Sequence, residues 1–195
     1  MIGPVHDSDI QSKPPPGLLE LDDFSIRPLG LEDFPLVTSL LHSVPPEVFE
    51  LPATDPMFRA FVGELFTKPW SLPFACFHSS EPVGLCFMNA GQLKNLNAYL
   101  VALFSRPAEA ALPLALYIRH AFWTFPLHRL YAQLPALPAV VPSIDALFAV
   151  GFKREGILVA HIGTPDEPTD AIAVGLLREE FDGWCEQNDP RLVLK

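Results

Sequence analysis

The chain has 195 residues, of which 49% are hydrophobic and 18% are charged, and its formal net charge is −10 at pH 7. This composition is that of a packed globular protein, so intrinsic disorder is excluded for most of the chain. The net negative charge argues against nucleic-acid binding, which needs lysine and arginine clustered against the phosphates.

We expect neither a membrane anchor nor a secretory signal in the first residues. No apolar run in the chain approaches the roughly 18 residues of a membrane-spanning helix. Residues 1–17 contain Pro14-Pro15-Pro16 and no basic region followed by an apolar stretch. We expect residues 1–17 to be a flexible, proline-rich tail, residues 18–195 to be a single domain, and the protein to be cytoplasmic.

The domain is predicted to begin with one strand and two helices. Residues 24–29 alternate apolar and polar side chains, which indicates a strand. Residues 31–43 carry apolar side chains at helical spacing, and Pro45-Pro46 ends that helix. A second helix is predicted over 55–67, with Asp55 as its N-cap and a proline at its first helical position.

The rest of the chain mixes strands and helices. Strands are predicted over 72–77, 83–88 and 98–104, the last nearly all apolar, as in a strand buried on both faces. In chain order there follow a helix after residue 107, a strand over 130–134, a helix over 142–150 ended by Gly151, strands over 153–162 and 170–177, and a closing helix over 179–187. Such mixing indicates an α/β sheet with crossover connections.

No metal site is expected. The three cysteines, Cys76, Cys86 and Cys185, lack the close pairs of a zinc site or a disulfide framework, and we predict reduced, structural thiols. The six histidines show no metal-ligand spacing either.

Several segments, in the right order along the chain, resemble the Gcn5-related N-acetyltransferases (GNAT), and in particular their ribosomal-protein N-terminal acetyltransferase branch. The most specific is Gly151-Phe152-Lys153-Arg154-Glu155-Gly156, which resembles the family's G-F-x-x-E-G. The others are Ile26-Arg27-Pro28-Leu29 followed by Glu32-Asp33, Pro82-Val83-Gly84, Ala121-Phe122 with Leu127-His128-Arg129-Leu130, and the ending over 170–181.

The resemblance implies a GNAT fold, with a mixed, mostly antiparallel central sheet of about seven strands and helices on both faces. In that fold the fourth and fifth strands splay apart and acyl-coenzyme A, here acetyl-CoA or another acyl-CoA, enters the gap. The fourth strand would be residues 98–104, and the pyrophosphate would lie where the next helix begins. The implied cofactor-binding residues are Leu103, Phe104, Ser105, Arg106, Ala108, Ala110, Ala111 and Ser143.

The predicted pyrophosphate loop, residues 105–111, departs from the family pattern because it has no glycine. Helix N-termini bind anions through free N–H groups, yet Pro107 has none to donate and Glu109 brings a charge of the wrong sign. Pro113 could also restart the helix one turn later. Arg106 could hold phosphate where backbone amides fail. Two interpretations stay open: a loop that binds phosphate through Arg106, and one that only links strand to helix.

The candidate catalytic residues are Ser143 and His161. The family's N-x-x-S and its tyrosine fall here on Val140, Ser143 and Leu147, so only the serine remains. Ser143 could serve the leaving thiolate, or it could only cap a helix after Pro142.

His161 could accept a proton from the acceptor amine, or it could be a satisfied residue of the sheet. Further candidates for the base are Asn97, Tyr99, Glu50 and Glu64, and Phe66, Trp70 and Phe74 could line an acceptor pocket or belong to the core.

The leading hypothesis is therefore an N-acyltransferase that moves an acyl group, with acetyl first among the candidates, from acyl-CoA to an amine of a small molecule or peptide. No nucleic acid or membrane is expected as a partner, and a homodimer is one assembly that we consider. Two alternatives remain: a GNAT-fold binding protein without transferase activity, and a GNAT that uses a non-standard acyl donor such as a carrier-protein thioester.

Overall fold

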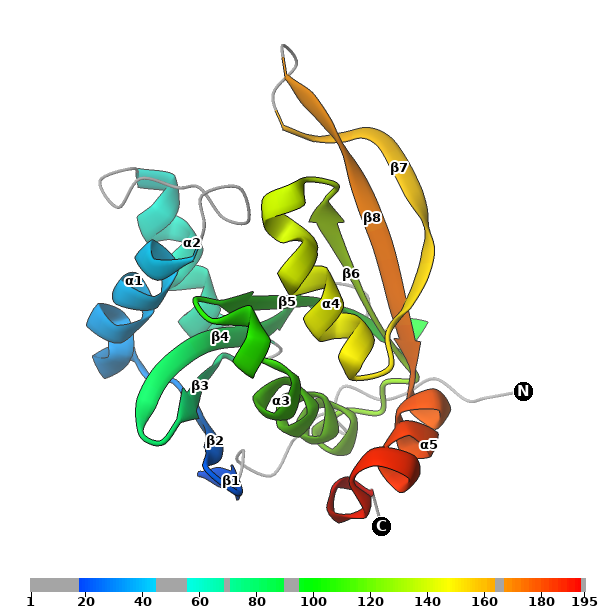
Figure 1. The fold of residues 1–195 in the computed structure, drawn as a ribbon. Coiled ribbons are helices and arrows are strands. Elements are labelled where there is room, and N and C mark those ends of the chain that lie inside the picture. Colours follow the sequence, from blue (N-terminus) through cyan, green and yellow to red (C-terminus); the bar gives the residue numbers. More distant parts are fainter. Residues whose placement is uncertain (1–17, 45–55, 69–70, 90–94, 164–166, 194–195) are drawn as a thin grey trace.

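The computed structural model describes residues 18–44, 56–68, 71–89, 95–163 and 167–193 (Figure 1). The predicted tail over 1–17 and the predicted helix end at Pro45-Pro46 lie outside these residues, as does the predicted N-cap Asp55. None of the described helices is long and apolar enough to cross a membrane.

One mixed sheet forms the centre of the structure, and its eight strands follow the order β1-β2-β3-β4-β5-β6-β8-β7. All neighbouring strands are antiparallel except β5 and β6, which are parallel. The strands are β1 (Leu19–Leu21), β2 (Phe24–Pro28), β3 (Phe74–His78), β4 (Glu81–Asn89), β5 (Asn97–Phe104), β6 (Arg129–Pro135), β7 (Lys153–Gly163) and β8 (Pro168–Leu177). The expected mixed, mostly antiparallel α/β sheet is confirmed, and the strand beyond the expected seven is the short β1.

Helices cover both faces of the sheet (Figure 1). On one face α1 (Phe34–Ser43) and α2 (Pro56–Thr67) bury Val37, Leu40 and Leu65 against Leu85 and Phe87 of β4. The larger core lies on the other face, under the helices α3 (Ala111–Thr124), α4 (Val141–Ala149) and α5 (Arg178–Asn188).

The motif at the start of the domain is an ion-paired turn. Arg27, on β2, donates two hydrogen bonds to the Asp33 carboxylate, at 2.9 Å and 2.7 Å. Asp33 also accepts the backbone N–H of Gly30 at 3.0 Å, just before a short 3-10 turn (Leu31–Asp33) leads into α1. The hydrogen bond from Arg27 lowers the pKa of Asp33 below its ordinary value, so the pair holds the first strand to the first helix.

The G-F-x-x-E-G segment turns the chain from α4 into β7. Gly151 has φ +95°, a left-handed conformation that side chains other than glycine rarely adopt. Glu155 pairs with Arg129 of β6 at 2.5 Å and lies over Gly175 of β8, where a Cβ atom would collide with its carboxylate. In this motif the glycine therefore ends α4, and the glutamate side chain lies across β8 to reach β6.

The two parallel strands diverge after a short common stretch. β5 pairs with β6 only from Asn97 to Tyr99, opposite residues 129–131, whereas it pairs with β4 as far as Phe104. The β6-facing edge of residues 101–104 therefore has no strand partner. The structure corrects the expectation that β5 is buried on both faces: Tyr99, Val101 and Ala102 are only partly buried, because they lie at this opening.

Candidate active site

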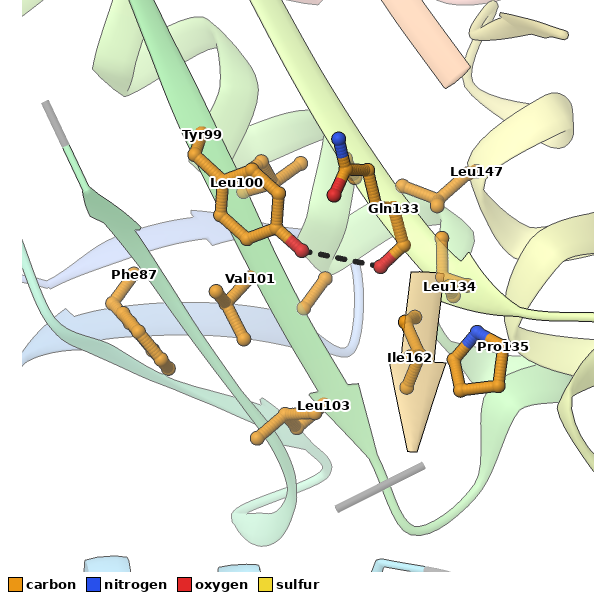
Figure 2. Close-up of a pocket in the computed structure, with 12 residues that line it drawn as sticks. Phe87, Tyr99, Leu100, Val101, Leu103, Gln133, Leu134, Pro135, Leu147 and Ile162 are labelled. Atoms are coloured by element: carbon orange, nitrogen blue, oxygen red, sulfur yellow. Dashed lines mark hydrogen bonds between the residues drawn. The ribbon is translucent and has the colours of Figure 1, made fainter. Parts of the chain in front are cut away.

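A cavity of about 280 Å³ occupies the opening between β5 and β6 (Figure 2). Its wall is mostly apolar, and its polar side chains are those of Tyr99 and Gln133. The lining residues are Phe87, Tyr99, Leu100, Val101, Ala102, Leu103, Ala132, Gln133, Leu134, Pro135, Leu147 and Ile162. An apolar cleft with a few convergent polar groups is the usual form of a ligand site.

Tyr99 and Gln133 span the point where the strands part. The Tyr99 hydroxyl donates a hydrogen bond to the backbone carbonyl of Gln133 at 3.1 Å, drawn as the dashed line in Figure 2. Burial raises the pKa of Tyr99 above its ordinary value, so the phenol stays protonated near neutral pH. The bond replaces a lost backbone pairing and holds β6 at a fixed separation from β5.

The loop that follows β5 reaches α3 through one tight turn. Residues Pro107–Glu109 form a 3-10 helix, and α3 begins at Ala111 with no side-chain hydrogen bond at its N-terminus. The α-helix therefore begins one short turn after the end of β5, as the presence of Pro113 suggested, and Pro113 lies in the first turn of α3. Ala110 is completely buried at this junction, whereas Ala108 is exposed and Ala111 is partly buried.

The one arginine of this loop is already paired with carboxylates. Arg106 donates to Glu109 at 3.2 Å and to Glu81, at the start of β4, at 3.1 Å. The second oxygen of Glu109 accepts from His78 Nδ1 at 2.7 Å. Two carboxylates therefore surround one guanidinium, and an incoming phosphate would have to compete with both for Arg106.

Several solved structures have a fold similar to that of this chain. An acetyltransferase candidate from T. thermophilus is 24% identical, with a TM-score of 0.68, and the match covers 91% of this chain and 97% of that chain. RimJ from Mycobacterium smegmatis, solved with CoA-disulfide, is 21% identical over 80% of this chain and 83% of that chain, with a TM-score of 0.63. Spermidine N-acetyltransferase from Vibrio cholerae, solved with CoA and spermine, is 14% identical over 83% and 99%, with a TM-score of 0.67.

The strand order and the splayed parallel pair indicate the same fold as these solved structures. This chain has the GNAT acetyltransferase fold. No protein-family model matches the sequence, and a search of curated proteins found no significant match.

Of the cofactor candidates at the end of β5, one lines the cavity, one is buried against β4, and one has its polar groups occupied. Leu103 lines the cavity, whereas Phe104 is buried against Gly84 of β4. Ser105 uses both its backbone N–H, at 3.0 Å, and its hydroxyl, at 3.1 Å, to bind the Val83 carbonyl. Its hydroxyl therefore anchors the loop to β4 in this structure.

Ser143 lies inside α4 and does not cap it. The helix begins at Val141, so the interpretation of Ser143 as an N-cap is wrong; Pro142 is already in the first turn, where its missing N–H costs nothing. One turn further on, Leu147 lines the cavity, at the position where the GNAT branch that the sequence resembles has a tyrosine. The cavity thus meets an aliphatic side chain there in place of a phenol.

His161 lies near the far end of β7, where the hairpin with β8 extends beyond the rest of the sheet (Figure 1). Its side chain is exposed, and Nε2 lies 3.0 Å from Oε1 of Gln133. The next residue, Ile162, lines the cavity. The two candidate catalytic residues, Ser143 and His161, form no hydrogen bond with each other.

The remaining candidates lie in different parts of the structure. Phe74 is fully buried in the core, where it contacts Tyr117 and His120, so it lines no acceptor pocket. Glu64 pairs with Lys68 on the surface of α2. Glu50 and Trp70 lie outside the described residues.

Sequence reasoning missed three residues of the site. Gln133 and Glu81 contact the candidates His161 and Arg106, and His78 contacts Glu109 of the predicted phosphate loop, in each case from 25 to 31 residues away in the chain. Gln133 was detectable as the one polar side chain that alternates with buried residues along β6 toward its open end. Neither Glu81 nor His78 carried a comparable signal. Among the described residues, no cluster of histidine, cysteine and acidic side chains could hold a metal ion.

Proposed function

We propose that this protein is an N-acyltransferase that moves an acyl group, with acetyl the first candidate, from acyl-CoA to an amine. The observation that carries the proposal is the 280 Å³ cavity along the unpaired edge of β5. A pantetheine chain is extended and has amide groups that can pair with a strand edge, as an added strand does. Two of the structurally similar proteins were solved with coenzyme A or its disulfide, which supports the same ligand here.

The two candidate catalytic residues can supply the proton transfers that acyl transfer needs. The amine nitrogen attacks the thioester carbonyl carbon, the C–S bond breaks, and a proton passes from the amine to a base and another to the leaving thiolate. His161 is the proposed base, because one of its ring nitrogens contacts Gln133, which lines the cavity. Ser143 is the proposed donor to the thiolate. With Leu147 in place of a phenol, we expect slow turnover.

The proposed acceptor is an amine of a small molecule or a peptide. An acyl acceptor must be a neutral amine in the reaction but arrives as a cation, and the chain has a net charge of −10 that attracts cations. The similar spermidine N-acetyltransferase was solved with spermine, which supports a polyamine as the first compound to test.

A second function, a GNAT-fold binding protein without transferase activity, is favoured by the pairing of Arg106. A guanidinium held by Glu81 and Glu109 has its charge neutralised twice over before any phosphate arrives. If that arrangement persists, the cofactor phosphates have neither glycine-backed amides nor a free cation. The same pairing of Arg106 would also fit an acyl donor that lacks the pyrophosphate, such as a carrier-protein thioester.

Thermal unfolding with ligands separates these functions. A ligand that binds only the folded state raises the melting temperature, so millimolar acetyl-CoA should raise it by several degrees. Arg106→Ala should remove most of that shift, and Arg154→Ala, which changes an exposed arginine of β7, should not. Pantetheine is the third ligand, and an equal shift with pantetheine and acetyl-CoA would favour a donor without pyrophosphate.

Turnover is then measured with acetyl-CoA and a panel of polyamines, aminoglycoside-like amines and peptides. Release of free thiol that depends on the amine supports the transferase. A thermal shift without any thiol release supports the binding protein. The absence of a shift with every acyl-CoA would overturn the transferase proposal.

A further inference from the structure

Gln133, which lines the cavity, contacts His161 although the two residues belong to strands that are not neighbours. Gln133 is on β6 and His161 is on β7, with β8 between them in the sheet. The 3.0 Å contact forms because the β7–β8 pairing is irregular between Leu158 and Ile162, where β7 carries extra residues. This irregularity lets the end of β7 bend over toward β6.

The chemistry of the contact fixes the direction of the hydrogen bond. A side-chain amide oxygen can only accept, so the 3.0 Å contact requires a proton on His161 Nε2. In the neutral ring the remaining lone pair then lies on Nδ1. We propose that Gln133 is a positioning residue that holds His161 in the Nε2–H tautomer and leaves Nδ1 free to accept the proton of the acceptor amine.

Gln133 is itself held from two sides, which makes it suited to this task. Its backbone carbonyl accepts from Tyr99 on β5, and its backbone pairs with Ala173 on β8. The amide carries no charge, so it orients the ring and stabilises the imidazolium less than a carboxylate would. A base oriented by a third group is the arrangement that recurs in enzymes whose histidine accepts a proton.

The neighbouring ionisable groups do not replace Gln133 in that role. Tyr99 is engaged with the Gln133 carbonyl, and its raised pKa keeps it neutral. Asp170, on β8, accepts the backbone N–H of Ala160 at 2.9 Å, which stabilises the left-handed conformation of that residue, φ +49°. The role assigned to Gln133 rests on the proposed function, since a positioned base has meaning only if an amine is acylated.

The tautomer is measured first, on the intact protein and without substrate. Nitrogen-15 NMR of the histidine ring at pH 8 distinguishes a proton on Nε2 from one on Nδ1. We expect Nε2–H for His161 in the wild type and a mixture of tautomers in Gln133→Leu. A wild-type ring protonated on Nδ1, or a tautomer that Gln133→Leu leaves unchanged, would overturn the inference whether or not the protein has activity.

Kinetics give the second readout. Gln133→Leu should lower kcat at least tenfold with little change in the KM for acetyl-CoA, as loss of an orienting partner does. Gln133→Glu keeps an acceptor oxygen and should recover most of that kcat. Its carboxylate stabilises the imidazolium, so the acid limb of the pH–rate profile should move up by about one pH unit.

Gln187→Glu and Gln187→Leu, on the exposed end of α5, are the matched controls and should leave the kinetics unchanged. A merely structural Gln133 would change stability without moving the acid limb, and this result would overturn the inference. If the wild type acylates no amine at all, the proposed function fails, and the NMR measurement still decides whether Gln133 sets the tautomer.

Discussion

Arg106 and Glu109 form an ion pair of 3.2 Å within the turn that joins β5 to α3, where the resemblance to GNAT proteins predicts the cofactor phosphates. The pair joins Glu81 and His78 in one network, so the only arginine of the loop is engaged before a ligand arrives. The competition between Glu109 and a phosphate for this guanidinium should set the affinity for acyl-CoA.

Glu109→Gln should strengthen acetyl-CoA binding. Removing one negative charge next to a pyrophosphate relieves a repulsion of about 1 kcal/mol at 4 Å in water, which corresponds to about a fivefold lower Kd. Isothermal titration calorimetry at low salt measures the change, and the gain should shrink as salt is added. Glu186→Gln, at an exposed position of α5, is the control. Equal affinity of Glu109→Gln and wild type would show that phosphate does not approach this loop.

Arg178→Ala should destabilise the fold. Arg178, the first residue of α5, donates to the carbonyls of Phe125 and Leu127, each at 2.9 Å, and to that of Phe122, so it satisfies the C-terminal end of α3. Its guanidinium also lies over the Phe122 ring. Removing a charged donor leaves these acceptors unpaired, and we expect a loss of about 2–3 kcal/mol in the free energy of unfolding.

Urea denaturation measures that loss, and Arg154→Ala on exposed β7 should change the free energy of unfolding by less than about 0.5 kcal/mol. Equal stability of the two variants would contradict the capping role of Arg178.

His120 should make the protein lose stability in acid. The side chain is buried in α3 beside Phe74, and burial lowers its pKa to about 4 from an ordinary value of 6.5. The unfolded state binds a proton below pH 6.5 while the folded state resists it until about pH 4, so the free energy of unfolding falls across that window. The slope is about 1.4 kcal/mol per pH unit at most, and above pH 6.5 this residue adds no pH dependence.

His120→Phe tests this slope by urea denaturation at pH 7, 6, 5 and 4. The variant should show a flatter decline than the wild type, because the carboxylates are common to both. His128→Gln, at an exposed position, should follow the wild type. A His120→Phe variant as acid-sensitive as the wild type would show that another group causes the loss.

Tyr117→Phe should cost about 1–2 kcal/mol of stability, because a buried hydrogen bond is lost. The Tyr117 hydroxyl, fully buried in α3, donates to the Leu72 carbonyl at 3.0 Å, and Leu72 is itself buried. Without the hydroxyl that carbonyl loses its partner in a dry environment. Tyr131→Phe is the matched control, since its hydroxyl bonds no described residue. A thermal melt that lowers only the Tyr117→Phe midpoint confirms the role, and equal midpoints would exclude it.

The order of the elements and the class of the fold followed from the sequence, because apolar periodicity and Gly/Pro positions record local backbone structure and burial. The strand predicted over 130–134 is an example, since β6 runs over Arg129–Pro135, and Gly151 ends α4 where a left-handed residue was needed. The strand β1 was missed, since three residues are too few for a periodic signal.

The sequence alone also determined which residue types are absent: the phosphate loop has no glycine, and position 147 has no tyrosine. Only the tertiary structure decided what the remaining residues do. Arg106 pairs with Glu81, His161 pairs with Gln133, and the Sγ atoms of Cys76 and Cys86 lie 3.7 Å from each other. These contacts depend on strand register and on where β5 leaves β6, and no local pattern encodes the distance between residues that the chain separates by 10 to 28 positions.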